Sequence, residues 1–341
     1  MGQQGKQYNV AVVGATGIVG HEFLKIAAQR AFPLKGLKLL ATERSAGKRI
    51  PFGEGEIQVE VTTPQSFAGS DFVFISASGA ASREYAPIAR DAGAIVIDDS
   101  SVWRQEPDVP LVIPEVNPDD VDWHKGILAI PNCSTTPLVM CLWPLHRLNP
   151  VRRIVADTYQ SVAGTGTAAM AELDEESRAW ADGREAIPHT YPHEIAFNLL
   201  PHIDNFLDSG YTKEEWKMMA ETRKIMHEPE LPLSATCVRV PVFVSHSLAV
   251  HVEFERPMRA ADVRDVLREA PGVVVQDDPA VNLYPMPRAA AGHDPVYVGR
   301  IREDMSNPNG VAMWISNDNL RKGAALNAIQ IAEEMVARGL V

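Results

Sequence analysis

The distribution of apolar residues changes character near the middle of the chain. In the first part, short and almost continuously apolar runs alternate with segments of helical spacing. Strands with so little polar alternation are covered on both faces, which predicts a doubly wound parallel sheet with right-handed crossovers. The predicted elements are strands at 8–14, 37–42, 71–77 and 94–100, and helices at 18–30 and 80–92.

The second part has longer strand candidates in which apolar and polar residues alternate. Alternation is typical of strands with one solvated face, so we predict an α+β region with a mixed or antiparallel sheet. Segments rich in proline and glycine are expected to be loops. The strands are predicted at 153–162, 237–255, 296–304 and 310–318, the helices at 166–181, 211–227 and 320–339, and the loops at 183–192, 228–233 and 284–295.

Composition narrows the classes of function. The 341 residues predict about two domains, since one core rarely grows past roughly 250–300 residues. The formal net charge of −12 disfavours binding to nucleic acid or to anionic membranes. No apolar run approaches the ~20 residues that span a bilayer. The three cysteines show no paired spacing, and the amino terminus lacks an apolar signal-peptide core, so we expect a cytoplasmic, reducing location.

A glycine-rich turn follows the first predicted strand. Gly14, Gly17 and Gly20 stand between that strand and the next helix, where backbone N–H groups could approach a pyrophosphate. In this strand–turn–helix context, dinucleotide binding is favoured over a purely structural turn. The candidate residues here are Gly14, Thr16, Gly17, Ile18, Val19 and Gly20.

The end of the second predicted strand bears on the choice of cofactor. Thr42, Arg44 and Ser45 stand where NAD enzymes usually present a carboxylate to the ribose. An arginine with hydroxyl groups suits a 2′-phosphate, so NADP is favoured. Glu43 counts against this choice. A solvated surface charge is the alternative interpretation of Arg44.

Cys133 lies at a junction between two kinds of structure. An apolar strand candidate, GILAIPN, leads into a helical segment, STTPLVMCLWPLHRL, with hydroxyl residues as helix caps and Pro137 in the first turn. A helix amino terminus favours thiolate over thiol, so Cys133 is a candidate nucleophile. Cys141 and Cys237 are instead expected to be small buried apolar residues.

Six segments together resemble the bacterial aspartate-β-semialdehyde dehydrogenases, in order and over nearly the whole chain. The resemblance implies a Rossmann-like NADP-binding domain at 1–132 with 320–341, and a catalytic and dimerisation domain at 133–319. It also implies reduction of β-aspartyl phosphate in the biosynthesis of lysine, threonine, methionine and diaminopimelate, by a homodimer or homotetramer. The segments are GATGIVG (14–20), DDSSVWR (98–104), PNCSTTP (131–137), TYQSVAGTG (158–166), RVPVFVSHS (239–247) and NDNLRKGAA (317–325).

The same resemblance implies roles for individual residues. Cys133 would form a thioester with the aspartyl β-carbonyl, His246 would act as acid and base on the hemithioacetal oxygen, and Gln160 would orient the substrate. Arg239 would bind the substrate α-carboxylate through its planar guanidinium, and Glu221 would bind the α-ammonium group.

Two further groups of residues follow from the resemblance. One would bind the phosphate and comprises Lys224, Arg104 and Asn132. The other would line the nicotinamide half of the cofactor and comprises Ser76, Ala77, Gly79, Gly164 and Asn319. The family's SVSGAG loop is interrupted here by Ala163 and Thr165, to which we assign no role.

Other interpretations stay open at this point. N-acetyl-γ-glutamyl-phosphate reductase shares this fold and chemistry, although a free-amine partner such as Glu221 counts against it. A non-catalytic NADP-binding homologue is the alternative of another class. His189 and His193 are interpreted as loop residues without a metal ion, since no third ligand is evident. The charges at 174–180 and 213–217 are expected to lie on solvated helix faces.

Overall fold

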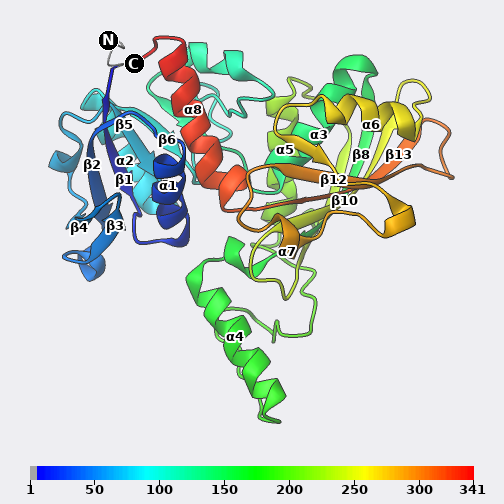
Figure 1. The fold of residues 1–341 in the computed structure, drawn as a ribbon, viewed down its shortest axis with the longest axis horizontal. Coiled ribbons are helices and arrows are strands. Elements are labelled where there is room, and N and C mark those ends of the chain that lie inside the picture. Colours follow the sequence, from blue (N-terminus) through cyan, green and yellow to red (C-terminus); the bar gives the residue numbers. More distant parts are fainter. Residues whose placement is uncertain (1–5) are drawn as a thin grey trace. The chain divides into compact units, whose positions relative to one another are not determined.

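The computed structural model describes residues 6–341, which form two compact units. Unit 1 contains the chain up to Pro131 and its final segment, Ala324–Val341, whereas unit 2 contains Asn132–Gly323. Figure 1 shows a mostly parallel sheet with flanking helices in the first unit and a second sheet with its own helices in the other. Within residues 6–341, no helix is both long and apolar enough to cross a membrane.

Unit 1 is built on a seven-stranded sheet with the order β3-β4-β2-β1-β5-β6-β7. All neighbouring strands are parallel except the β3–β4 pair, so the predicted doubly wound sheet is confirmed. Its strands are β1 (Tyr8–Val13), β2 (Leu34–Ala41), β3 (Arg49–Phe52), β4 (Gly55–Val61), β5 (Phe72–Ile75), β6 (Ile95–Asp98) and β7 (Ile127–Ala129). Its helices are α1 (Ile18–Gln29), α2 (Gly79–Asp91) and α8 (Leu326–Ala337).

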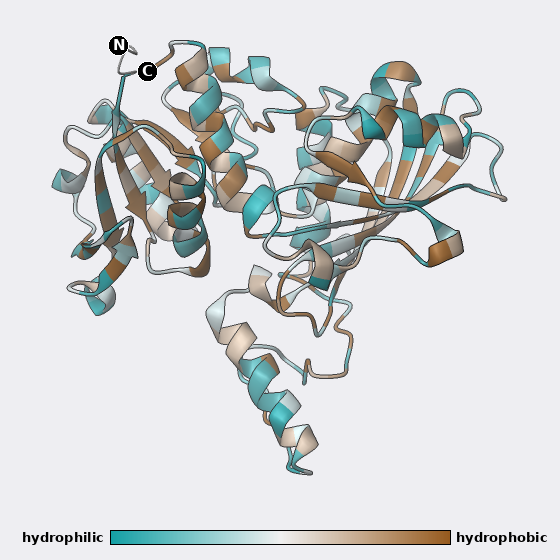
Figure 2. Cartoon of the chain, viewed as in Figure 1, coloured by the Kyte–Doolittle hydropathy of each residue, from teal (hydrophilic) through white to brown (hydrophobic). Residues whose placement is uncertain are grey.

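The hydrophobic core of unit 1 includes residues from α8, near the carboxyl terminus of the chain. The apolar strands, brown in Figure 2, pack with α1 and with α8 into one cluster. Phe23 of α1 stacks on Phe74 of β5 with ring centroids 4.4 Å apart. Ile329 and Met335 of α8 are buried in the same cluster. Each such side chain contributes roughly 1.5–3 kcal/mol by leaving water, so α8 is an integral part of this unit.

Unit 2 is built on a six-stranded mixed sheet with the order β11-β12-β13-β10-β8-β9, as the alternating pattern predicted. Helices α3, α5 and α6 pack against it, and α3 also packs against α5 and α6. Its strands are β8 (Val151–Gln160), β9 (Leu233–Arg239), β10 (His246–Phe254), β11 (Val273–Val275), β12 (Val296–Glu303) and β13 (Gly310–Asn317). Its helices are α3 (Thr135–Leu148), α4 (Thr167–Ala181), α5 (Lys213–Ile225), α6 (Ala260–Arg268) and α7 (Pro287–Ala290).

Helix α4 projects from the sheet of its own unit in Figure 1 and carries a small core of its own. The prediction that the charges at 174–180 are solvated is wrong for Glu176, which is buried. Its carboxylate accepts the backbone N–H groups of Ile195 and Ala196, both at 2.8 Å. Glu172, also buried, binds the backbone of the 189–191 segment in the same way. These carboxylates are buried because they satisfy the backbone of the following loop.

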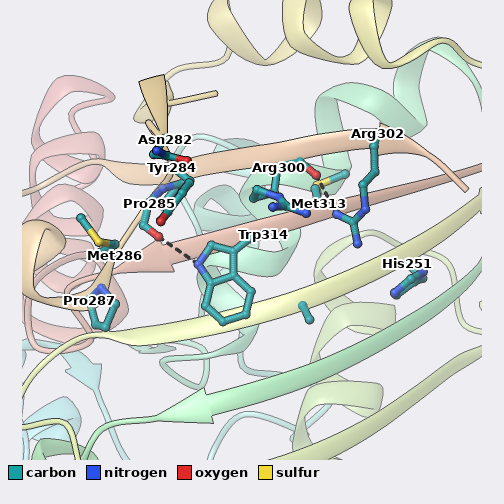
Figure 3. A pocket seen from close by; sticks show the side chains of 11 residues that line it. His251, Asn282, Tyr284, Pro285, Met286, Pro287, Arg300, Arg302, Met313 and Trp314 are labelled. Atoms are coloured by element: carbon teal, nitrogen blue, oxygen red, sulfur yellow. Dashed lines mark hydrogen bonds between the residues drawn. The ribbon is translucent and has the colours of Figure 1, made fainter. Parts of the chain in front are cut away.

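A pocket also lies on the sheet of unit 2, over β10, β12 and β13. In Figure 3, the indole of Trp314 stands at its centre, and its Nε1 donates a hydrogen bond of 3.0 Å to the carbonyl of Pro285. The same indole packs on Tyr159 of β8 with ring centroids 5.2 Å apart. The sheet therefore presents aromatic surface here, from the half-buried Trp314 and the exposed Tyr159.

Candidate active site

The sheet of unit 2 brings three of the predicted site residues to one edge. Gln160 is the last residue of β8, and the parallel register with β9 places it opposite Arg239, the last residue of that strand. His246 is the first residue of β10, which runs antiparallel to β8. Parallel strands end at the same edge of a sheet, and an antiparallel neighbour begins at that edge. The three side chains therefore lie at the edge where β8 and β9 end and β10 begins.

Cys133 stands directly before α3, and its sulfur meets His246. The distance from Cys133 Sγ to His246 Nε2 is 3.2 Å. Cys133 is half-buried, whereas His246 is completely buried. Thiol and imidazole are therefore in direct contact, in the arrangement of an activated nucleophile.

The first turn of α3 is capped differently from the prediction. The Ser134 hydroxyl makes no capping hydrogen bond, so the predicted hydroxyl cap is wrong. Asn132 takes this role instead. Its side-chain oxygen accepts the N–H of Ser134 at 2.8 Å, and its carbonyl accepts the N–H of Thr136 at 3.0 Å. The amide of Asn132 is thus engaged in holding the turn that presents Cys133.

Gly323 closes the other side of Cys133. It lies in a π-helical turn, Arg321–Ala325, which precedes α8 and shortens the helix predicted at 320–339. A Cβ at position 323 would lie 3.0 Å from the Cβ of Cys133 and 3.3 Å from its Cα. π-Turns occur frequently at functional sites. A side chain at position 323 would therefore crowd the cysteine and would force it to shift by a few tenths of an ångström.

The environment of Arg239 suits an anionic ligand. The guanidinium is buried, and its NH1 donates a 2.7 Å hydrogen bond to the carbonyl of Ser161. The ring of Tyr191 lies 6.0 Å from the guanidinium carbon. Among the described residues, Nε of Arg239 has no hydrogen-bond partner. Because a buried guanidinium N–H is costly when unpaired, this group is well placed to bind a carboxylate.

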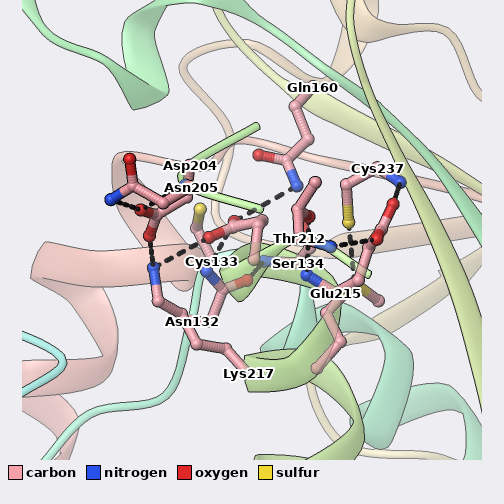
Figure 4. A network of polar contacts seen from close by, with 12 residues as sticks. Asn132, Cys133, Ser134, Gln160, Asp204, Asn205, Thr212, Glu215, Lys217 and Cys237 are labelled. Carbon is pink, nitrogen blue, oxygen red and sulfur yellow. Dashed lines mark hydrogen bonds and ion pairs between the residues drawn. The ribbon is translucent and has the colours of Figure 1, made fainter. Parts of the chain in front are cut away.

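A buried carboxylate that sequence analysis missed connects several site residues. Glu214 of α5 accepts hydrogen bonds from Nδ2 of Asn132 at 2.7 Å and from Nε2 of Gln160 at 3.3 Å. Lys217 forms an ion pair with it at 3.1 Å and reaches Asp204 at 2.7 Å, in the network of Figure 4. Burial acts to raise the pKa of Glu214, but Lys217 and the Asn132 amide outweigh it and lower that pKa.

The prediction that the charges at 213–217 lie on a solvated face holds for Lys213, which is exposed, and is wrong for the two glutamates. Glu214 and Glu215 are both buried. Glu215 and Thr212 form a reciprocal capping box, in which the hydroxyl accepts one backbone N–H and the carboxylate accepts the other. The T-x-x-E spacing at 212–215 was a signal for that cap. No comparable signal in the sequence identifies Glu214.

The predicted phosphate and ammonium ligands lie at several places. Glu221 of α5 is buried and accepts the backbone N–H of Asn132 at 2.6 Å. Lys224, one turn further along, is half-buried. In unit 1, Arg104 is buried and donates a 2.8 Å hydrogen bond from NH2 to the carbonyl of Asp99. The first two lie in unit 2, at the helix that carries Glu214.

Unit 1 contains a pocket of about 500 Å³ at the ends of β1, β2 and β5. Pockets for cofactors and other small ligands measure ~300–1,000 Å³, so a nucleotide portion fits. Eight of the predicted cofactor residues line it: Gly14, Thr16, Gly17, Thr42, Arg44, Ser45, Ser76 and Ala77. Sequence analysis missed other lining residues, among them Thr62 and Tyr85, because they come from segments without a glycine or charge signal.

The glycine turn forms a cradle that larger residues would fill. Gly14 has φ +84°, and a Cβ there would lie 2.0 Å from the carbonyl oxygen of Ser76. A Cβ on Gly20 would lie 2.4 Å from the carbonyl oxygen of Gly14. Ile18 and Val19 belong to the first turn of α1 behind this turn. Gly14 and Gly20 thus allow the turn to pack tightly against neighbouring backbone, as the glycines of a dinucleotide-binding turn do.

The other three predicted cofactor residues lie elsewhere. Gly79 is the first residue of α2. A Cβ at this position would lie 3.2 Å from the side chain of Val102. Gly164 and Asn319 belong to unit 2. A Cβ on Gly164 would lie 3.0 Å from NH1 of Arg239 and 3.2 Å from the ring of His246. Asn319 is buried, and its side-chain oxygen accepts hydrogen bonds from two protein groups.

The other two cysteines and the two loop histidines were predicted to have no catalytic role. Cys141 and Cys237 are fully buried, as predicted, and burial raises the pKa of both thiols. His189 and His193 lie in the loop after α4, as predicted. Over residues 6–341, no group of three or more His, Cys, Asp or Glu side chains is placed to hold a metal ion.

Known proteins match this chain over nearly its whole length. The models described as "Semialdehyde dehydrogenase, NAD binding domain" and "Semialdehyde dehydrogenase, dimerisation domain" match residues 9–124 and 142–322. The aspartate-semialdehyde dehydrogenase of Aquifex aeolicus (strain VF5) is 50% identical, over 98% of this chain and 99% of that one. The chain belongs to the aspartate-semialdehyde dehydrogenase family.

Solved structures of aspartate-semialdehyde dehydrogenases share this fold. Enzyme II from Vibrio cholerae, complexed with ASA, is 42% identical, with a TM-score of 0.95 over 97% of this chain and 99% of that one. The enzyme from Candida albicans, solved with NADP, is 27% identical, with a TM-score of 0.78 over 98% of this chain and 100% of that one. As a member of this family, the chain is an oxidoreductase that acts on an aldehyde group, and unit 1 contains its NAD(P)-binding domain.

Proposed function

We propose that this chain reduces β-aspartyl phosphate to aspartate β-semialdehyde and phosphate with NADPH, through a thioester on Cys133. The observation that carries the proposal is the 3.2 Å contact between Cys133 Sγ and His246 Nε2 at the start of α3. The thiolate attacks the β-carbonyl carbon, phosphate leaves, and the sulfur holds the acyl group. The same sulfur is a good leaving group once the acyl carbon has been reduced.

Substrate binding follows from the polar groups around the thiol. We assign the α-carboxylate to Arg239, because its buried guanidinium has an N–H that no described protein group satisfies. We assign the α-ammonium group to Glu221, and the phosphate to Lys224, Arg104 and Asn132. Gln160 orients the substrate, and its own amide is held by Glu214 at 3.3 Å.

The lining of the nucleotide pocket supports NADP as the cofactor. Thr42, Arg44 and Ser45 line it where a 2′-phosphate would need a cation and hydroxyl donors, and Glu43 is the opposing charge. The relative from Candida albicans was solved with NADP, which supports the same choice. When bound, the cofactor supplies the hydride that reduces the thioester. Gly164 and Asn319 are assigned to its nicotinamide end.

We further propose that residues up to 132 with 320–341 act as the cofactor domain, and that 133–319 form the catalytic and dimerisation domain of a homodimer or homotetramer. The dimerisation-domain model over residues 142–322 supports this division. The aromatic surface around Trp314 and Tyr159 offers apolar area for such an interface. The product would serve the biosynthesis of lysine, threonine, methionine and diaminopimelate, in the cytoplasm.

Steady-state kinetics in the reverse direction test this proposal. Purified protein is mixed with aspartate semialdehyde, phosphate and NADP⁺, and formation of NADPH is followed by absorbance. We expect NADPH to form only with phosphate present, and NADP⁺ to be preferred over NAD⁺. N-acetylglutamate semialdehyde serves as the comparison substrate. A preference for that compound, or NADPH formation without phosphate, would contradict the proposal.

A further inference from the structure

Tyr191 lies beside the guanidinium that the proposed function assigns to the substrate carboxylate. The centre of its ring is 6.0 Å from the guanidinium carbon of Arg239, a distance at which an aromatic ring still attracts a cation. Tyr191 is half-buried and packs against the small apolar core that α4 carries. Neither the sequence motifs nor the proposed reaction gives this tyrosine a role.

We propose that Tyr191 is a positioning residue that fixes the plane of the Arg239 guanidinium, and thereby the place of the substrate α-carboxylate. This inference rests on the proposed function, in which Arg239 binds that carboxylate. A guanidinium binds a carboxylate through two parallel N–H groups, so the affinity depends on the direction in which its plane is held.

The turn after β8 contacts both the guanidinium and the tyrosine. NH1 of Arg239 donates a 2.7 Å hydrogen bond to the carbonyl of Ser161, and a Cβ on Gly164 would lie 3.0 Å from the same nitrogen. The hydroxyl of Thr165 shares a 2.8 Å hydrogen bond with the hydroxyl of Tyr191. Thr165, which interrupts the family's loop pattern, thus ties the tyrosine to the turn that binds Arg239.

A buried carboxylate of α4 holds the backbone that carries the ring. Glu172 accepts the N–H groups of His189 at 2.9 Å and of Tyr191 at 3.1 Å, and also that of Thr190. Burial acts to raise the pKa of Glu172, but these backbone N–H groups outweigh it and lower that pKa. The carboxylate is therefore ionised at neutral pH, and its bonds to three successive N–H groups fix the backbone at position 191.

The other end of the same loop is joined to Arg239 itself. Leu200 and Arg239 exchange two backbone hydrogen bonds, of 3.0 Å and 2.8 Å. Between the two ends, Glu176 accepts two further backbone N–H groups. The loop 189–200 is thus anchored at three places, one of which is the backbone of Arg239. These anchors restrict movement of the Tyr191 ring relative to the guanidinium.

A neutral ring suits this place because it leaves the charge of Arg239 for a ligand. Burial raises the pKa of Tyr191 above its ordinary value, although the charge of Arg239 and the bond to Thr165 act against this rise. The phenol is therefore uncharged at neutral pH, whereas a carboxylate in its place would compete with the substrate. Among the described residues, Nε of Arg239 has no hydrogen-bond partner, so this N–H is left for the substrate.

Two substitutions at position 191 separate the ring from its hydroxyl. The readout is the KM of each substrate in the reverse reaction with aspartate semialdehyde, phosphate and NADP⁺. Tyr191→Leu removes the ring, and we expect it to raise the KM for the semialdehyde about tenfold, with the KM values for phosphate and NADP⁺ within about twofold of wild type. Tyr191→Phe keeps the ring and loses only the bond to Thr165, so the KM for the semialdehyde should rise about threefold or less.

The comparison of three KM values distinguishes positioning from a merely structural role. Phe197→Leu, at an exposed aromatic residue of the same loop, is the matched control and should leave all three values unchanged. A loss of folded protein would not raise the KM for one substrate alone. Equal rises in all three values, or an unchanged KM for the semialdehyde in Tyr191→Leu, would overturn the inference.

The partner of the tyrosine hydroxyl gives a second test. Thr165→Val removes the hydroxyl and keeps the shape of the side chain, so its effect should match that of Tyr191→Phe. The double variant should be no worse than either single variant, because all three lack the same hydrogen bond. Additive losses would show that Thr165 does not act through Tyr191.

A double-mutant cycle tests whether the ring acts through the guanidinium. In an Arg239→Lys background no guanidinium plane remains to be fixed. Tyr191→Leu should then lower kcat/KM for the semialdehyde by no more than about threefold, against about tenfold in the wild-type background. A full tenfold loss in both backgrounds would contradict the positioning role.

These readouts distinguish a failure of the inference from a failure of the proposed function. If the wild-type protein formed no NADPH from the semialdehyde, phosphate and NADP⁺, the proposed function would be wrong, and the role of Tyr191 would be wrong with it. If the wild-type protein turned over but Tyr191→Leu left the three KM values in their wild-type ratio, only the inference about Tyr191 would be wrong.

Discussion

The nucleotide pocket of unit 1 and the thiol site of unit 2 are both proposed to bind anionic groups, but their side chains differ in burial and in hydrogen bonding. The pocket is lined by backbone and by exposed side chains such as Thr42 and Arg44, which make few contacts of their own. At the thiol site, the side chains of Glu214 and Asn132 are buried and bind one another. The pocket therefore depends on shape and local charge, and the thiol site depends on preorganisation.

This difference predicts how each region responds to substitution. A change in the pocket should alter cofactor affinity and leave the chemistry intact. A change at the thiol site should alter the reaction rate, because the buried groups there hold one another in place.

Replacing the thiol should abolish turnover at the thiol site without affecting cofactor binding in the nucleotide pocket. In Cys133→Ala, turnover should fall by at least ~10⁴-fold, because no nucleophile remains, while the Kd for NADPH stays within a few-fold of wild type. The measurements are NADPH formation and fluorescence titration. Cys141→Ala, at a fully buried cysteine of α3, is the matched control and should keep its activity. Loss of NADPH binding in Cys133→Ala would show that the regions are not independent.

Replacing the guanidinium of Arg239 by an ammonium group should weaken binding of the substrate carboxylate. Arg239→Lys should lower kcat/KM more than tenfold, about 1.4 kcal/mol, because an ammonium group cannot form two parallel bonds to a carboxylate. Arg153→Lys, on the exposed part of β8, is the control. Near-normal kcat/KM in Arg239→Lys would refute two-point carboxylate binding.

A side chain at position 323, next to Cys133, should lower kcat about tenfold. In Gly323→Ala the new Cβ would stand 3.0 Å from the Cβ of Cys133, so the sulfur must move by a few tenths of an ångström. Gly55→Ala is the control, since its Cβ would meet nothing within 4 Å. Kinetics and the rate of thiol alkylation report the shift. Unchanged values for both would mean that the site tolerates more movement than a preorganised arrangement allows.

Removing the pocket cation should affect only the cofactor. Arg44→Ala should raise the Kd for NADPH up to about tenfold and leave that for NADH nearly unchanged, because only NADPH carries the 2′-phosphate. The single-turnover release of phosphate should stay at the wild-type rate. Equal weakening of both cofactors would show that Arg44 does not contact the 2′-phosphate.

Neutralising the buried carboxylate should lower stability by about 1 kcal/mol and in a pH-dependent way. The pKa of Glu214 is lowered in the folded protein, so its ionised form stabilises the fold above the ordinary pKa of 4.5, and this contribution is lost as pH falls through the lowered value. The difference between wild type and Glu214→Gln in urea unfolding should therefore be constant from pH 8 to 6 and shrink below pH 4.5. A difference that grew in acid would reverse the assigned direction.

Much of the fold could be predicted from the sequence because it depends on local pattern. Apolar runs and alternation indicated both sheets, and the glycine spacing at Gly14, Gly17 and Gly20 indicated the cradle. The β3–β4 hairpin was missed although residues 56–61 alternate between polar and apolar, because β3 has only four residues and most residues of both strands are exposed. Helix α6 was also missed, because its nine residues provide fewer than three turns of period.

The thiol site was predictable only in part. Cys133, Gln160, Arg239 and His246 lie at element ends and carry recognisable motifs, so the resemblance found them. The burial of Glu214 and the close approach of Gly323 depend on residues far away in the sequence. Contacts of this kind are set by tertiary packing, which no local spacing reveals.

Peptide mass mapping can detect a covalent acyl group on Cys133. Protein is mixed with β-aspartyl phosphate in the absence of NADPH, quenched in acid and digested. We expect one aspartyl adduct per chain, on the peptide that contains Cys133, with release of one phosphate. An adduct on another residue, or turnover by Cys133→Ala at the wild-type rate, would contradict it.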